Sequence, residues 1–120
     1  MLVVAVALAV ATGAVAEPAP ARQQQLVRMV RQDCGSCHGM RLTGGLGPAL
    51  TREALADRLP ESVAATIFHG RPGTPMPPWR AMLDEGEARW IAERLQAGFP
   101  EESPRGADAA GVLGVERNSR

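Results

Sequence analysis

The chain is short of the large rings that usually fill a small protein core. Its 120 residues include two Trp, two Phe and no Tyr, so that aromatic residues make up 3% of the composition. Aromatic side chains normally supply much of the area that a domain of this size buries, and a small core rarely stabilises a fold alone. We therefore expect something besides side chains to be buried with this chain, and an organic cofactor would meet that need.

The chain also lacks Lys and lacks net charge, because its 13 basic residues are all Arg and are balanced by 13 acidic residues. There is thus no overall field to recruit a nucleic acid or an anionic membrane. The charges are unevenly spread, with six Arg against three acids in residues 22–58 and six acids against two Arg in residues 84–102. This distribution fits either a dipole that orients the molecule toward a charged partner or an ordinary solvated surface.

No apolar run is long enough to span a membrane as a helix, which takes about 20 residues. Residues 2–11 are apolar and lead to the small residues of Ala14-Val15-Ala16, which is the form of a secretory signal peptide although no Lys or Arg precedes the run. We expect residues 1–16 to be a signal peptide cleaved after Ala16, and the mature protein to be periplasmic with no membrane span. In that oxidising compartment free thiols do not persist unless something occupies them.

No convincing strand pattern is present, and the pattern of apolar and breaking residues predicts helices joined by structured loops. We expect helices over residues 21–33, 51–59 and 60–69, and a last one that begins after Asp84 and stops at Gly98. Residues 40–50 and 70–79 are too rich in Gly and Pro for regular structure. The sequence thus predicts one all-α domain over residues 17–100, followed by a disordered tail over residues 101–120.

Both cysteines and one of the two histidines lie within the stretch DCGSCHG. Three chemistries use two thiols at this spacing with an adjacent His. Cys34 and Cys37 would attach a haem covalently while His38 binds its iron; they would form a redox disulfide; or they would be half of a zinc site. The redox disulfide normally sits on a βαβ scaffold, which this chain does not offer, and zinc needs two more ligands where only His69 remains. The haem interpretation is therefore favoured.

A haem bound by one imidazole needs a sixth ligand or stays open for chemistry. Met76 is our candidate, because it lies in a loop stiffened by proline on both sides, which would keep a weak thioether ligand at the iron. We expect Met29 to pack within its helix, and Met40 follows His38 too closely to reach the other face of the ring. Met82 is the reserve candidate, and His69 could also ligate, although a surface role at the end of its helix is favoured.

The segments CGSCHG, GGLGPAL and GTPMPPW, with an amphipathic helix on either side, together resemble the class I monohaem cytochromes c. The resemblance implies an all-α fold in which the first and last helices cross and the haem lies in a crevice between the loops. It also implies that the carbonyl of Pro48 accepts a hydrogen bond from the His38 imidazole, and that Trp79 packs near the haem. Three arginines are candidate partners of the haem propionates: Arg41, Arg71 and Arg80.

The segments QDCGSCHGMRLTGGLGPALT and GRPGTPMPPW are more narrowly similar to the small cytochromes of the c55X type, which are encoded with the haem d-containing nitrite reductase of denitrifying bacteria. This resemblance implies a monomeric one-electron carrier, with one haem c ligated by His38 and Met76, that meets its redox partners by transient contact. Electron donation to the nitrite reductase is the favoured role; a part in maturation or haem transfer for that enzyme is the alternative. We expect no enzymatic activity of its own.

Overall fold

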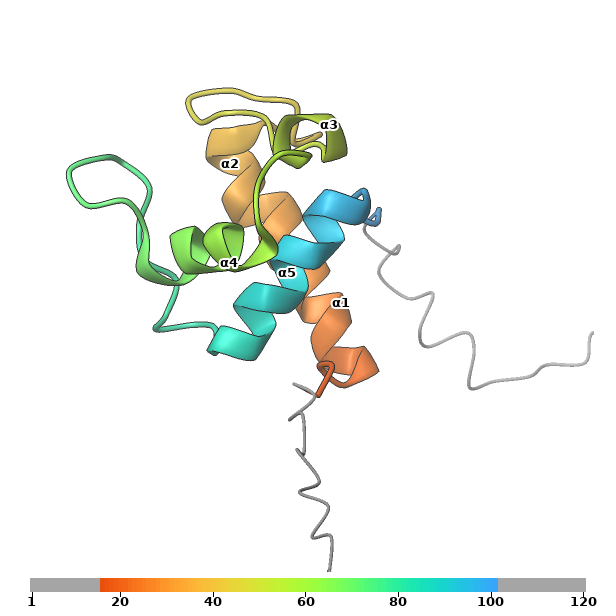
Figure 1. Cartoon of the computed structure of the whole chain (residues 1–120). Helices are drawn as coiled ribbons and strands as arrows, with labels where there is room; N and C mark the ends of the chain where they lie inside the picture. The colour runs from red at the N-terminus through yellow and green to blue at the C-terminus, as the bar shows by residue number, and fades with distance from the viewer. Residues whose placement is uncertain (1–15, 102–120) are drawn as a thin grey trace, which may run out of the picture.

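The computed structural model describes residues 16–101, and every regular element in this range is a helix (Figure 1). In chain order these elements are α1 (Pro20–Met29), η1 (Val30–Cys34), α2 (Gly35–His38), α3 (Arg52–Leu55), α4 (Pro60–His69) and α5 (Glu85–Ala97). The predicted all-α fold is confirmed. None of these helices has the combination of length and hydropathy that crossing a bilayer requires. The predicted signal segment up to residue 15 and the tail from residue 102 lie outside the described residues.

The first three elements form one unbroken helix from Pro20 to His38, which is longer than the predicted 21–33. Pro20 suits the first helical position because its missing N–H would have no partner there. The middle element, η1, is a turn of π-helix in which the Gly35 N–H reaches back to the carbonyl of Val30, so one extra residue fits into the turn. The helix stops at Gly39, whose φ of 89° few other residues adopt.

The predicted helix over residues 51–59 is much shorter in the structure. The Thr51 hydroxyl caps it by accepting from the Ala54 N–H at 3.2 Å, but the helix ends at Leu55. Pro60 keeps a helix from reaching the predicted end at residue 59, because the residue before a proline avoids the helical conformation, and Leu59 is extended with a ψ of 136°. The next helix, α4, begins at Pro60 and ends before Gly70, as predicted.

The last helix, α5, is confirmed with its capping box. Asp84 accepts a hydrogen bond from the Glu87 N–H at 2.7 Å, and Glu87 accepts one from the Asp84 N–H at 3.1 Å. Gly98, with a φ of 97°, ends the helix. The strong local signals at both ends explain why this helix could be placed from sequence.

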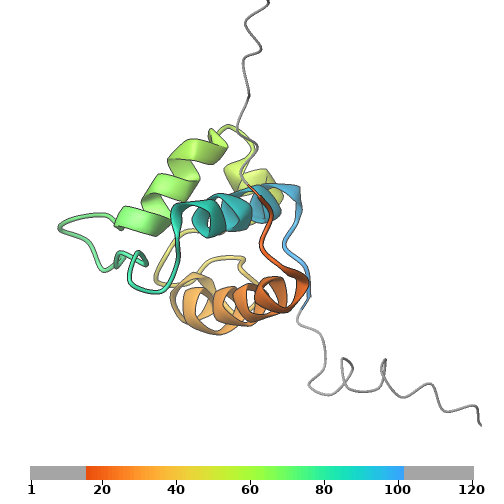
Figure 2. The ribbon, with the colours of Figure 1, turned by 90° about the horizontal axis from the view of Figure 1, so that it is seen from below.

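The core forms where α5 lies between α4 and the helix of residues 20–38 (Figure 2). Leu26 and Val30 of the first helix are fully buried there, and α4 contributes Ala64 and Ile67. The α5 helix contributes five buried side chains: Ala88, Trp90, Ile91, Ala92 and Leu95. The predicted crossing of the first and last helices is seen in Figure 1, and it leaves the end of the first helix, with its Cys and His residues, beside the loops.

Candidate functional site

The Cys and His residues of the motif occupy the last two turns of the first helix. Cys34 ends the π turn and is half-buried, Cys37 is exposed, and both thiols are free. His38 is half-buried at the helix end. The helical spacing places the two sulfurs and the imidazole on neighbouring turns, so that all three can meet one large flat group.

The environment of Cys34 does not suit thiol redox chemistry. Burial, with a smaller contribution from the charge of Asp33, raises the pKa of this thiol to about 11. Reactive redox cysteines instead have a lowered pKa, because the thiolate is the nucleophile. Zinc fits no better, since within residues 16–101 no cluster of three or more His, Cys, Asp and Glu side chains could hold a metal ion.

The loop after His38 is tied to the end of the helix by backbone hydrogen bonds. The Gly44 N–H donates to the carbonyl of His38 and the Gly47 N–H to that of Cys37, both at 2.8 Å. The loop thereby carries Pro48 to the imidazole, where its carbonyl oxygen lies 2.7 Å from Nδ1 of His38. A carbonyl can only accept, so Nδ1 carries the proton and Nε2 keeps a free lone pair, as a metal ligand requires.

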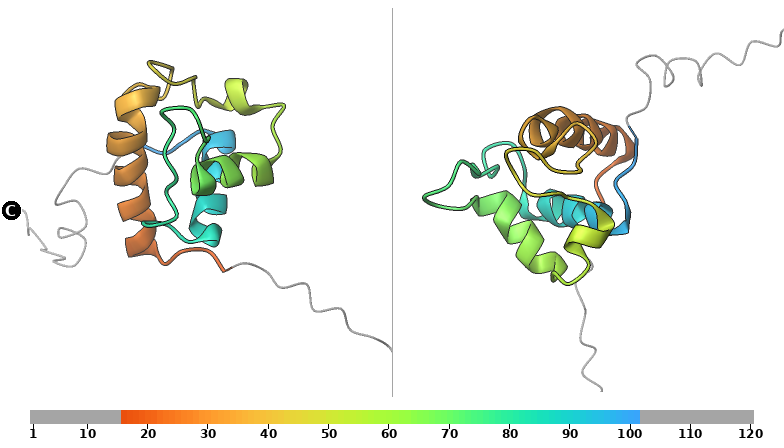
Figure 3. Two further views of the ribbon diagram at one scale, coloured as in Figure 1. Left: turned by 90° about the vertical axis from the view of Figure 1, so that its left-hand side faces the viewer. Right: turned by 90° about the horizontal axis from the view of Figure 1, so that it is seen from above.

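The loop that carries Met76 is closed at its base. The Arg71 N–H donates to the carbonyl of Met76 at 3.2 Å, and beyond the loop the Trp79 and Arg80 N–H groups donate to the last turn of α4 at 3.1 and 3.2 Å. Gly70 is needed here, because a Cβ on it would lie 2.7 to 2.8 Å from backbone atoms of residues 76–78. The loop projects from the side of the molecule that faces the viewer in the left panel of Figure 3, where the loop after His38 is also seen.

The side chains on these two loops fit an apolar disc such as a porphyrin. Met76 and Trp79 are half-buried, and Trp79 packs against the core. Leu46 in the first loop is 94% exposed, so this loop offers apolar surface that the described protein does not cover. Together with the free Nε2 of His38 and the two unpaired thiols, these residues match a haem attached through Cys34 and Cys37.

The structure brings Cys34, Cys37, His38 and Pro48 together at one end of the first helix, whereas Met76 and Trp79 come from the separate loop between α4 and α5. Their contact with a haem stays a prediction. The three candidate propionate arginines are all exposed, and none forms an ion pair with a carboxylate of residues 16–101.

Sequence reasoning missed one residue at this site, Gly47. Its Cα lies against the His38 ring, as the position of a hypothetical Cβ 2.7 Å from Cε1 and Nδ1 demonstrates. The only sequence signal was its place directly before Pro48, which by itself predicts a turn and not a contact with the imidazole.

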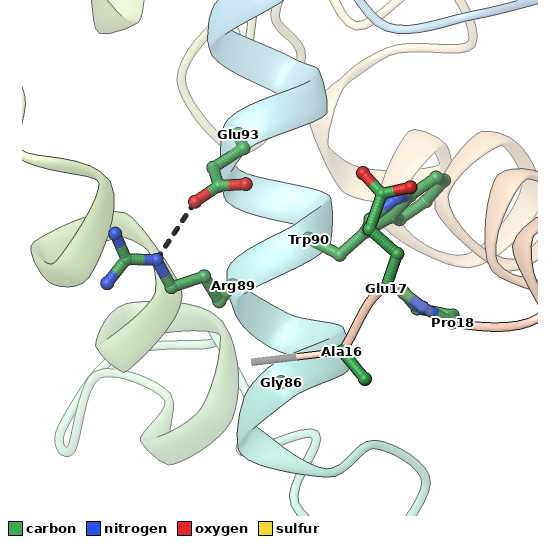
Figure 4. A pocket seen from close by; sticks show the side chains of 7 residues that line it. All are labelled: Ala16, Glu17, Pro18, Gly86, Arg89, Trp90 and Glu93. Carbon is green, nitrogen blue, oxygen red and sulfur yellow. Dashed lines mark hydrogen bonds and ion pairs between the residues drawn. The ribbon is translucent and has the colours of Figure 1, made fainter. Parts of the chain in front are cut away.

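Two hollows lie away from the motif. One, of about 350 Å³, lies between residues 16–18 and α5, and Trp90, Arg89 and Glu93 line it (Figure 4). The buried Trp90 Nε1 has no hydrogen-bond partner within the described chain. The other hollow, of about 670 Å³, lies between the loop after His38 and the end of α5. The first is lined by no residue that we predicted to bind the haem, and the second only by Arg41, a candidate propionate partner.

Known proteins resemble the chain over most of the described helical region. Residues 21–93 match the family described as cytochrome C oxidase, cbb3-type, subunit III. The chain is 58% identical over 85 residues to cytochrome c55X of Stutzerimonas stutzeri, covering 71% of this chain and 75% of that protein. Among solved structures it resembles the c-type cytochrome NirC, with a TM-score of 0.67, 55% identity and coverage of 72% of this chain and 100% of that one.

A larger protein contains a similar region. Dihydro-heme d1 dehydrogenase of Pseudomonas aeruginosa is 34% identical to the chain over 102 residues, which are 85% of this chain but 20% of that protein. The similarity thus concerns a small part of the dehydrogenase.

Proposed function

This chain belongs to the cytochrome c55X family of c-type cytochromes, and from that membership we propose that it is a periplasmic one-electron carrier that donates to the haem d-containing nitrite reductase. The family's covalently bound haem c supplies the redox chemistry, in which the iron accepts and releases one electron. The protein is a carrier and not an enzyme, because in this proposal both axial positions of the iron are filled.

The observation that carries the proposal is the 2.7 Å contact between His38 Nδ1 and the Pro48 carbonyl. In the neutral ring this hydrogen bond leaves the lone pair of Nε2 free and fixes its direction. Such an arrangement suits a metal ligand, whereas a surface histidine does not require it. Cys34 and Cys37, three residues apart on the same helix end, would hold the porphyrin so that the ring lies over this nitrogen. The His38 imidazole is then the first axial ligand.

Met76 is the proposed second axial ligand. Its loop is closed by the hydrogen bond from Arg71 and anchored to α4 through Trp79 and Arg80, so the thioether can be presented without a helix or strand around it. A methionine ligand favours the ferrous iron and raises the reduction potential, so the bound haem would take up an electron readily and pass it on only to a partner of higher potential. Trp79, half-buried beside this loop, would pack against the haem.

Two measurements test this function. Acid-acetone extraction should leave the red chromophore on the chain, which a non-covalent haem or a dithiol protein would not do. Stopped-flow mixing of the reduced protein with the nitrite reductase should then show oxidation of this haem within the turnover time of the enzyme. A covalent haem that is not oxidised by the reductase would contradict the donor role while leaving the carrier role intact.

The similarity to part of dihydro-heme d1 dehydrogenase favours a second candidate, a role in maturation of the reductase's haem d. A deletion strain separates the two roles. Loss of a donor leaves a complete reductase that lacks electrons and works with an artificial donor, whereas loss of a maturation factor leaves a reductase without its haem d.

The proposed periplasmic location rests on the segment before Glu17. Two residues that directly follow the expected cleavage point contact the rest of the domain: Glu17 pairs with Arg94 at 3.4 Å, and the Pro18 carbonyl accepts from the Gln23 side chain at 2.8 Å. Cleavage after Ala16 would keep both contacts in the mature chain. Intact-mass measurement of the protein from a periplasmic extract should give a chain that begins at Glu17, and a chain retaining residues 1–16 would contradict it.

A further inference from the structure

The His38 ring is held by the backbone from two directions. Pro48 accepts the Nδ1 hydrogen bond at 2.7 Å, and the residue before it, Gly47, lies against the ring. A Cβ added to Gly47 would be 2.7 Å from both Cε1 and Nδ1, closer than real Cβ atoms come to other atoms, and 3.2 Å from Nε2, which is a tight contact. No side chain can therefore stand at position 47 unless the imidazole or the loop moves.

The neighbouring glycines differ from Gly47 in this respect. A Cβ on Gly45 would meet the carbonyl oxygen of Cys37 at 2.8 Å, and its three nearest atoms include none of the His38 ring, while one on Gly35 would make only ordinary contacts of 3.6 Å or more. None of the three has a positive φ, so an alanine at any of them is compatible with the backbone conformation. The three positions therefore separate a close contact with the His38 ring, a close contact with the Cys37 backbone and ordinary packing.

We infer that Gly47 is a positioning residue for the proximal imidazole, which by having no side chain lets the ring take the plane in which Nδ1 donates to Pro48. The inference rests on the proposed role of His38 as haem ligand. A ring displaced by a Cβ would lengthen the Nδ1–H···O bond. This bond raises the basicity of the ligating Nε2, and a more basic ligand stabilises ferric iron. Weakening it should therefore raise the reduction potential.

The test compares three variants of the haem-loaded protein: Gly47→Ala, with Gly45→Ala and Gly35→Ala as matched controls. We expect an upward shift of the midpoint potential in Gly47→Ala, with altered bands of the low-spin haem, and no such change in either control. Gly45→Ala should lower thermal stability, because its Cβ meets the Cys37 carbonyl. An unshifted potential in Gly47→Ala, or an equal shift in Gly45→Ala, would overturn the inference.

A second measurement needs no variant and decides the matter if Gly47→Ala does not fold. In the diamagnetic ferrous protein, a strong nuclear Overhauser effect should connect a Gly47 Hα with the His38 Hε1, and its absence would overturn the inference. The same spectrum tests the premise separately. A ligating His38 has ring protons strongly displaced by the haem ring current, and their absence would contradict the ligand assignment itself.

Discussion

At the scale of single residues, the proposal depends most on Met76. Replacing it with Ala should remove the weak long-wavelength absorption of ferric thioether-ligated haem and lower the reduction potential, because the ligand that favours ferrous iron is lost. The vacated position should also bind added cyanide or imidazole faster. Optical titration of the purified variant measures all three changes.

Met82→Ala is the matched control, since this methionine belongs to the same connection between α4 and α5 but is 53% exposed. We expect its spectrum and potential to stay as in the unaltered protein. If the long-wavelength absorption disappeared in Met82→Ala and persisted in Met76→Ala, the two assignments would have to be exchanged.

The residues of the site differ in how far sequence alone could place them. Cys34, Cys37 and His38 follow from their spacing, because two thiols and an adjacent imidazole suit few chemistries. Pro48 could be named only through family resemblance, since nothing in its sequence neighbourhood says that its carbonyl faces an imidazole ten residues earlier. Gly47 could not be identified, because it contributes by lacking a side chain. That lack matters only because the His38 ring lies against it in the folded structure.

At the scale of elements, the π turn η1 sets the direction in which the motif points. Successive residues of an α-helix are turned by about 100°, and the π turn absorbs one extra residue, so that the residues after it keep the direction that a regular helix one residue shorter would give them. Inserting an Ala after Gln32 would add a second residue that the turn does not absorb, and should point Cys34 and His38 away from the face that Leu26 and Val30 bury. We expect a large loss of stability and of low-spin haem, measured by thermal unfolding and visible spectra.

Gln32→Ala keeps the length of the helix and is the control for this insertion. It should retain the spectrum of the unaltered protein and most of its stability, because the residue is exposed. An insertion variant that unfolded at the same temperature as Gln32→Ala and kept its low-spin haem would mean that the register of this turn has no part in orienting the site.

Glu87 joins α1 to α5 while also closing the capping box of α5. Arg22 donates to both of its carboxylate oxygens, and this hydrogen bonding lowers the pKa of Glu87 below its ordinary value of 4.5. Glu87→Gln should cost about 1 to 2 kcal/mol of unfolding free energy near neutral pH. The stability difference should be full above about pH 4.5 and vanish as the pH falls through the lowered pKa, because protonation removes the same charge.

Chemical denaturation of both proteins at several pH values measures this difference. Glu85→Gln is the control, since Glu85 lies in the same first turn of α5 but is exposed and has no ion pair among the described residues. A difference for Glu87→Gln that did not change on acidification would contradict the electrostatic explanation.

Sequence placed the helices to different degrees because their end signals differ in strength. The α5 helix has a capping box and a terminal glycine, and α4 has a proline and a glycine, so both could be bounded. The end of the first helix could not be bounded from sequence. The glycines of CGSCHG predict that the helix breaks there, but in the structure this segment continues the helix to His38. No propensity marks the π turn, which depends on packing at both of its ends.

At the scale of the whole molecule, the charged side chains are unevenly distributed although the net charge is zero. The two loops proposed to flank the haem, residues 39–50 and 70–83, contain Arg41, Arg71 and Arg80 and no acidic residue. None of these guanidinium groups is neutralised by a described carboxylate. A partner with an acidic surface would therefore be steered toward this side, even though the protein has no net charge.

Electron transfer to the partner should slow by about tenfold or more as ionic strength rises from low to physiological values, because salt screens this steering. Replacing all three arginines with Gln should reduce both the rate at low salt and its salt dependence. Stopped-flow rates over a salt series measure this, with Arg58→Gln, an exposed arginine outside both loops, as the control. An equal effect of Arg58→Gln, or no salt dependence, would contradict a specific basic face.

The closed base of the Met76 loop also bears on how fast an electron can be exchanged. An electron moves only when the surroundings of the iron suit both oxidation states, so any ligand that shifts between them adds to the reorganisation energy. The hydrogen bond from Arg71 to the Met76 carbonyl and the tight crossing at Gly70 fix the ligand's backbone independently of the iron. Lengthening this loop should therefore slow self-exchange between ferrous and ferric molecules even where the potential is unchanged.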